Sequence, residues 1–283
     1  MKTAELYGDL WRRYSNELFE ESVQLFYRRF EANGFDLKWF EGKRCLDVGC
    51  GGGRYSIAMA RLGAEVAGID ISGEGLEDAR KRVRSEKVTF QEADACHLSF
   101  PDASFDFVCC SGVLHHIPSS WMVWNEIARV LKPGGLLYLM VYGAGGLRWP
   151  LVGQMRRIAR DIGYRIVNEV SLRILPINKQ RTFLDDLFVP YIQFAPLVIT
   201  LSQLKASGWD NIELWEKGKL DHEASRGALR QDLEYWGLLF RNLPGEDAKR
   251  MVGKISWVWY QTWFRSNKAV FGEGNIRLLA RRK

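Results

Sequence analysis

Apolar strand segments alternate with helical segments between residues 44 and 142, and this alternation constrains the fold more than any other sequence feature. The predicted strands lie at 44–48, 64–70, 87–91, 105–110 and 136–142, and the predicted helices between them at 54–62, 74–84 and 120–131. Apolar strands joined by helical crossovers favour a parallel sheet covered on both faces. Ligands of such sheets bind beyond the carboxyl ends of the strands, so the loops there are the candidate ligand-binding segments.

The alternation stops after residue 143, where the pattern becomes mostly helical. Further helices are expected at 15–33, 147–175 (one or two), 197–207, 221–243 and 246–266. Residues 183–190 form an irregular aromatic segment, whereas 209–215 and 275–280 have the pattern of strands. The fold class is therefore α/β, with seven strands in all and two helical insertions.

Composition sets limits on the class of protein. The 283 residues are 47% hydrophobic and 26% charged, which is typical of a globular chain. No apolar run approaches the roughly 20 residues of a membrane span, and the N-terminal residues lead into charged helical sequence rather than a secretory stretch. The five cysteines form no C-x-x-C pair, so we expect reduced thiols in the cytoplasm and no metal site.

The net charge of +6 is unevenly distributed. Residues 1–147 hold 17 basic and 20 acidic residues, while 148–283 hold 23 basic and 14 acidic ones. Seven of the eleven tryptophans also lie after residue 148. Helices with basic solvent faces explain this pattern, and a phosphate-bearing partner such as RNA is the alternative.

A cluster of glycines follows the first predicted strand, in the run Leu46-Asp47-Val48-Gly49-Cys50-Gly51-Gly52-Gly53-Arg54. Glycine lets the backbone approach a ligand closely, and the next helix offers free N–H groups. A dinucleotide loop G-x-G-x-x-G would need its third, packing glycine where Arg54 stands, and no Gly-Lys-Ser/Thr ending is present. Asp47 is unfavourable beside a phosphate, so a ligand with a cationic end suits this loop better.

Acidic residues follow the next two strands. Asp70 ends the second strand and Asp94 follows the third. A carboxylate at the first position can accept both hydroxyls of a ribose, and one at the second can accept an exocyclic amine. A lone Asp at a strand end is usually a turn or a helix cap, but three of them at successive strand ends favour a nucleoside ligand.

These runs resemble the class I S-adenosylmethionine-dependent methyltransferases, whose loop has the form E/D-x-G-x-G. The resemblance covers residues 40–143, and the runs at 100–106 and 128–135 look very like its small-molecule branch. It extends to the helix and strand at 197–215 and to a last, antiparallel strand at 275–280. It implies a Rossmann-like seven-stranded methyltransferase sheet with helical lid insertions.

The resemblance also implies S-adenosyl-L-methionine as cofactor and S-adenosyl-L-homocysteine as its product. The residues that it assigns to the cofactor are Asp47, Gly49, Gly51, Gly52, Asp70, Ile71, Asp94, Ala95, Ser111 and Tyr14. Asp70 would hold the ribose hydroxyls, Asp94 would accept the adenine amine, and Asp47 would lie near the methionine amino group. Trp11 is the alternative to Tyr14 as the residue that closes over the cofactor.

The pattern of strands and helices, together with this resemblance for the core, divides the chain into segments with different expected roles. They are an N-terminal helical cap (1–42), a cofactor-binding core (43–143), a lid insertion (144–196), a core helix and strand (197–217), a second helical insertion (218–270) and the last core strand (271–283). The aromatic, basic insertions are expected to fold over the acceptor and exclude water from it.

Two of the four histidines, His115 and His116, follow the fourth strand. Methyl transfer from a sulfonium needs mainly alignment, but an oxygen or carbon acceptor must also lose a proton. Either histidine is a candidate base, with His116 preferred, and bracing of the loop is the alternative. Other residues expected to contact the acceptor are Tyr142, Trp149, Arg181, Asp185, Asp186 and His222.

The expected acceptor is a small or carrier-borne metabolite, methylated on oxygen, nitrogen or carbon. The alternative is an RNA (tRNA) methyltransferase that uses the basic second half. The Asn/Asp-Pro-Pro-Tyr/Phe and Pro-Cys motifs of nucleic-acid methyltransferases are absent, as is any RNA-binding module signature. A cofactor-binding protein without turnover and a nicotinamide oxidoreductase are weaker alternatives. The acceptor atom and the oligomeric state stay open.

Overall fold

The computed structural model describes residues 3–11, 15–144, 148–217, 234–239, 241–243, 245–246 and 275–283. The chain divides into two compact units, the first comprising 1–142, 190–219 and 275–283 and the second 143–189 and 220–274. The helices expected at 221–243 and 246–266 lie mostly outside the described residues. None of the helices that the structure describes combines the length and apolar character needed to cross a membrane.

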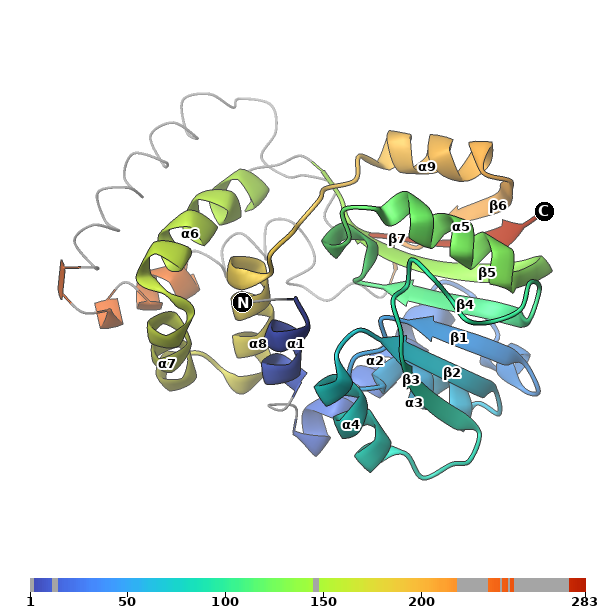
Figure 1. Cartoon of the computed structure of the whole chain (residues 1–283), viewed down its shortest axis with the longest axis horizontal. Helices are drawn as coiled ribbons and strands as arrows, with labels where there is room; N and C mark the ends of the chain where they lie inside the picture. The colour runs from blue at the N-terminus through green and yellow to red at the C-terminus, as the bar shows by residue number, and fades with distance from the viewer. Residues whose placement is uncertain are drawn as a thin grey trace. The chain divides into compact units, whose positions relative to one another are not determined.

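The first unit contains a seven-stranded sheet in the order β3-β2-β1-β4-β5-β7-β6 (Figure 1). Its strands are β1 (Arg44–Val48), β2 (Glu65–Asp70), β3 (Val88–Glu92), β4 (Phe105–Ser111), β5 (Leu131–Tyr142), β6 (Trp209–Leu214) and β7 (Asn275–Arg282). Strands β1 to β5 are parallel, and β7 is antiparallel to both β5 and β6. The predicted Rossmann-like sheet with a last antiparallel strand is confirmed.

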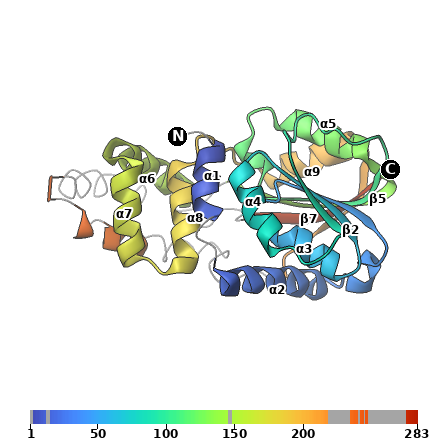
Figure 2. The ribbon, with the colours of Figure 1, turned by 60° about the horizontal axis from the view of Figure 1, so that its bottom comes forward.

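Helices cover both faces of this sheet (Figure 2). On one face α2 (Asn16–Ala32) and α3 (Arg54–Arg61) pack through residues such as Phe26 of α2 and Met59 of α3. On the other, α5 (Ser120–Val130) and α9 (Leu197–Ala206) pack through Ile127 and Leu204. The remaining helices of this unit are α1 (Thr3–Trp11), η1 (Leu37–Phe40), α4 (Gly73–Arg82) and η2 (Leu114–His116).

The strand order reverses at β1, because its neighbours are β2 on one side and β4 on the other. Register pairs Val48 of β1 with Ile69 of β2 and with Cys110 of β4. The three strands therefore end at the same edge of the sheet. Ligands of open parallel sheets bind at this kind of switch point, beyond the carboxyl ends of the strands.

The second unit corrects one prediction. Residues 183–190 were expected to be irregular, but Phe183 to Phe188 belong to α8 (Ile177–Phe188), which follows α6 (Arg148–Ile162) and α7 (Tyr164–Ile174). The buried side chains Leu184, Leu187 and Phe188 recur at helical spacing, so they form one buried face. Pro190 follows the C-cap, as is common after a helix, and makes the segment look irregular in sequence.

Strand β5 also differs from its predicted bounds. It begins at Leu131 instead of residue 136. Leu131 pairs with Phe105, and a shift of register follows before Leu136 pairs with Phe107. The run Lys132-Pro133-Gly134-Gly135 is therefore an irregularity within a strand. In the sequence, the same run looks like a turn between a helix and a strand.

Candidate functional site

The glycine loop joins β1 to α3 in a conformation that requires glycine. Gly49, Gly51 and Gly53 have positive φ angles of 68°, 52° and 78°. A Cβ on Gly49 would lie 2.3 Å from the side chain of Val113, and one on Gly51 would lie 2.2 Å from the indole of Trp11. Trp11, at the end of α1, therefore lies directly against the loop, whereas Tyr14 is outside the described residues.

Asp47 lies beneath this loop and is 3% exposed. The Ser56 hydroxyl of α3 donates to its Oδ2 at 2.6 Å. Burial raises the pKa of Asp47 to about 6, because desolvation of the carboxylate outweighs the Ser56 hydrogen bond and the charge of Arg54. Among the described residues, Asp47 thus contacts α3, and its expected role near a ligand amino group stays a prediction.

Asp70 bridges the loops that follow β1 and β2. Its Oδ2 accepts the N–H of Gly51 and its Oδ1 accepts the N–H of Ser72, both at 2.8 Å. Burial raises the pKa of Asp70, and the backbone N–H donors oppose that shift. The side chain of the neighbouring Ile71 is 53% exposed.

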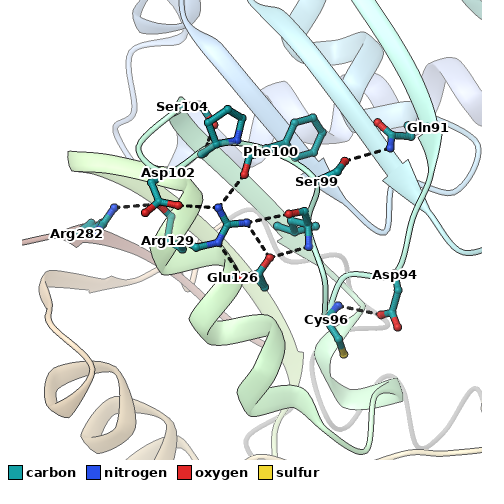
Figure 3. Close-up of polar contacts among 12 residues, drawn as sticks. Gln91, Asp94, Cys96, Ser99, Phe100, Asp102, Ser104, Glu126, Arg129 and Arg282 are labelled. Atoms are coloured by element: carbon teal, nitrogen blue, oxygen red, sulfur yellow. Dashed lines mark hydrogen bonds and ion pairs between the residues drawn. The ribbon is translucent and has the colours of Figure 1, made fainter.

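Asp94 begins the loop between β3 and β4. Its Oδ1 accepts the N–H of Cys96 at 2.8 Å (Figure 3). Its main-chain carbonyl accepts the N–H of His97 at 3.0 Å. The side chain is 56% exposed, and Oδ2 lies 3.9 Å from Nδ1 of His97. Ala95 is buried in the core below. The turn thus fixes one carboxylate oxygen and leaves the carboxylate substantially accessible.

The two histidines lie just beyond Ser111, the last residue of β4, and their surroundings differ. His115 stacks on Tyr142 with ring centroids 3.7 Å apart. The Tyr142 N–H donates to Nδ1 of His115 at 3.3 Å, so the proton of that ring is on Nε2. Burial, with a smaller effect of His116, holds the pKa of His115 well below its ordinary value. His115 is therefore neutral at physiological pH.

His116 has the opposite tautomer. Its Nδ1 lies 3.0 Å from the main-chain oxygen of Tyr191, which can only accept a hydrogen bond. Nδ1 therefore carries the proton of the neutral ring and Nε2 carries the lone pair. Tyr7 of α1 packs on this ring with centroids 5.9 Å apart. The arrangement leaves His116 with a proton acceptor at Nε2.

Sequence reasoning missed the segment that holds the two histidines. Tyr191 acts through its carbonyl, and Gln193 donates its main-chain N–H to the oxygen of His115 at 2.8 Å. Main-chain groups leave no residue-type signal, so no motif could have indicated them. Of the other expected acceptor residues, Tyr142 lies at the histidines, whereas His222 is outside the described residues and Trp149, Arg181, Asp185 and Asp186 belong to the second unit.

Comparison with known proteins gives the family. A family model for a methyltransferase domain matches residues 46–139. The 27-O-demethylrifamycin SV methyltransferase of Amycolatopsis mediterranei is 41% identical over 140 residues, which cover 46% of this chain and 50% of that protein. A ubiquinone biosynthesis O-methyltransferase of Azoarcus sp. is 38% identical over 198 residues, covering 58% of this chain and 85% of that protein. The chain thus spans half the length of the first relative and most of the second.

Solved structures share the fold. The YcgJ protein of Bacillus subtilis superposes with a TM-score of 0.55 at 20% identity, covering 93% of this chain and 99% of that one. The [4+2]-cyclase SpnF gives a TM-score of 0.53 at 23% identity, covering 92% of this chain and 80% of that one. The chain belongs to the class I S-adenosylmethionine-dependent methyltransferases.

The residues at this edge of the sheet fit the family's cofactor, S-adenosylmethionine. Each oxygen of Asp70 accepts one backbone N–H and retains a second lone pair for a ribose hydroxyl. The exposed side chain of Ile71 offers an apolar surface to a base. Gly49 and Gly51 have no room for a Cβ, as expected where a backbone approaches other groups closely.

Proposed function

We propose that this chain transfers a methyl group from S-adenosylmethionine to a hydroxyl of a small or carrier-borne metabolite, with His116 as general base. The observation that carries the proposal is the 3.0 Å approach of His116 Nδ1 to the Tyr191 carbonyl. It holds the proton on Nδ1 and leaves Nε2 to take a proton from a hydroxyl. His115 is assigned a positioning role, because its Nδ1 already accepts from Tyr142.

The cofactor supplies a methyl group on a sulfonium, which needs no further activation. In the proposal, Gly49, Gly51 and Gly52 bring the backbone to its methionine and ribose part, and Ser111 lies at the methionine end. Asp70 accepts the ribose hydroxyls, with Ile71 against the adenine. Asp94 and Ala95 contact the adenine edge, Asp47 favours the cationic amino group by its charge, and Trp11 or Tyr14 closes over the cofactor.

Oxygen is proposed as the attacking atom, in preference to nitrogen or carbon, because of the names of two matched relatives. One is named a 27-O-demethylrifamycin SV methyltransferase and the other a ubiquinone biosynthesis O-methyltransferase. A hydroxyl needs a base, whereas a neutral amine does not. The RNA alternative rests only on the charge of residues 148–283 and has no such support. A cytoplasmic location is part of the proposal and agrees with five cysteines that form no disulfide.

The test is methyl transfer to a panel of phenols, catechols and aliphatic alcohols. His116→Ala is expected to lower kcat by about 10²–10⁴-fold, because a positioned base contributes roughly that much. The Kd of S-adenosylhomocysteine, measured by calorimetry, should remain unchanged. His115→Ala should instead lower the melting temperature, since it removes a buried ring that stacks on Tyr142.

Three results would contradict the proposal. Full activity of His116→Ala would leave alignment alone as the mechanism and remove the base. A joint loss of melting temperature and cofactor affinity, with normal kcat at saturation, would mean that His116 only braces the loop. Methylation of amines but of no hydroxyl in the panel would change the attacking atom.

A further inference from the structure

Arg129 of α5 is bound by the loop that precedes β4. Its Nε donates to Glu126 Oε1, Nη1 donates to the Phe100 carbonyl and to Asp102 Oδ1, and Nη2 donates to the Leu98 carbonyl and to Glu126 Oε2 (Figure 3). These five bonds measure 2.7–2.8 Å. Because a guanidinium has five N–H groups, all of its donors are used.

The partner Glu126 continues the same network. Its Oε2 also accepts the N–H of Leu98 at 2.6 Å, so both main-chain groups of Leu98 are held by one Arg–Glu pair. The hydrogen bonds of Arg129 to Glu126 and Asp102, together with the negative charges of these two carboxylates, raise the pKa of Arg129. Because every N–H of this guanidinium is already bonded, none is left to bind a ligand. We therefore expect Arg129 to act by holding the loop.

That loop spans the residues between the end of β3 at Glu92 and the start of β4 at Phe105. It contains no helix or strand, so its shape depends on side-chain bonds and on two buried anchors, Ala95 and Leu98. Asp94 stands at its start, four residues before Leu98. Its Oδ1 is held by Cys96, and its exposed carboxylate keeps further accepting capacity.

We propose that Arg129 is the positioning residue for recognition of the cofactor's adenine, acting by holding the Leu98–Asp102 segment so that Asp94 presents its carboxylate to the exocyclic amine. This inference rests on the proposed function, which assigns the adenine to Asp94. A lysine cannot replace the arginine, because an ammonium has three donors and lacks the planar fork that reaches two carboxylates and two carbonyls.

A merely structural role and a positioning role predict different binding data. If Arg129 only stabilises the fold, its loss weakens every cofactor analogue alike. If it positions Asp94, its loss weakens those ligands that carry the amine. The discriminating pair is S-adenosylhomocysteine and its inosine analogue, in which the exocyclic amine is replaced by a carbonyl oxygen that a carboxylate repels.

The experiment measures the Kd of both ligands by calorimetry for the wild type, Arg129→Met, Arg129→Lys and Asp94→Ala, and for the double variant Arg129→Met/Asp94→Ala. The control is Ile127→Ala, which opens a cavity on the buried face of the same helix and removes none of the hydrogen bonds that hold the loop. Melting temperatures of all variants report how much each change destabilises the fold.

In the wild type we expect a preference of at least about tenfold for the adenine ligand, as for a hydrogen bond to a charged group. Arg129→Met should weaken that ligand about tenfold and reduce the preference to about twofold or less. Arg129→Lys should recover only part of it. In the Asp94→Ala background, Arg129→Met should have little further effect, because residues acting through one contact are not additive.

Three results would overturn the inference. They are an unchanged preference in Arg129→Met, equal weakening of both ligands, or an equal loss of preference in Ile127→Ala at similar melting temperature. Arg129→Lys serves the same comparison if the methionine variant does not fold. Failure of the wild type to bind S-adenosylhomocysteine at all is a different outcome, because it removes the proposed function and this inference with it.

Discussion

Asp47 carries a buried carboxyl group whose pKa of about 6 lies above its ordinary 3.8. A raised pKa in the folded state stabilises the protonated acid. Its stabilising contribution is therefore present below the unfolded pKa and is lost as the pH rises through about 6. We predict that Asp47→Asn raises the free energy of unfolding at pH 7–8 by at most about 3 kcal/mol, from a shift of about two pKa units.

The gain should shrink as the pH falls from 6 to 4, where Asp47 itself becomes neutral. Denaturant unfolding of both proteins across pH 4–8 measures this, and a difference that stays constant over that range contradicts it. Sequence reasoning singled out Asp47 as a ligand contact, which stays a prediction, and did not indicate its burial. Its burial and its bond to Ser56 depend on how α3 is rotated against β1, which packing sets and the motif does not encode.

At the scale of elements, the contact between α1 and the glycine loop is open to a direct test. Gly51→Ala would combine a strained φ of 52° with a Cβ 2.2 Å from the Trp11 indole. Gly134→Ala is the matched control, because Gly134 has φ 76° and no atom within 4 Å of the added Cβ. A positive φ alone costs a non-glycine residue roughly 1–2 kcal/mol.

We therefore predict that Gly51→Ala lowers the free energy of unfolding by more than Gly134→Ala does. The difference between these two losses of free energy should become smaller in a Trp11→Ala background, because the clash between the new Cβ and the indole is then absent. Chemical denaturation of the wild type, the three single variants and both glycine variants in the Trp11→Ala background measures the coupling. Equal losses for Gly51→Ala and Gly134→Ala would show that Trp11 does not constrain the loop in solution.

The elements also show what a sequence can predict here. Strand and helix periodicity located the seven strands, because buried strands between helices have few alternative arrangements. The same reasoning was wrong about α8, because Pro190 made a helical segment look irregular. It also placed the start of β5 too late, because a glycine-rich irregularity resembled a loop. Residue types indicated the histidine pair, but the Tyr191 carbonyl that distinguishes the two rings comes from a segment 75 residues away.

At the scale of the whole molecule, the second insertion (218–270) can be removed, because it connects β6 and β7, which are neighbours in the sheet. The Trp215 N–H donates to the Arg277 carbonyl at 2.9 Å, so a short flexible linker can replace residues 221–268. All residues assigned to the cofactor belong to the first unit. S-adenosylhomocysteine should therefore still bind to the shortened chain, within about threefold, and raise its melting temperature. Turnover should be lost, because we expect the insertion to supply acceptor contacts.

Calorimetry and a methyl-transfer assay separate the two effects. Retained activity on the native acceptor would remove the insertion from the acceptor site, whereas lost cofactor binding in a folded variant would show that residues 221–268 are needed for the cofactor site.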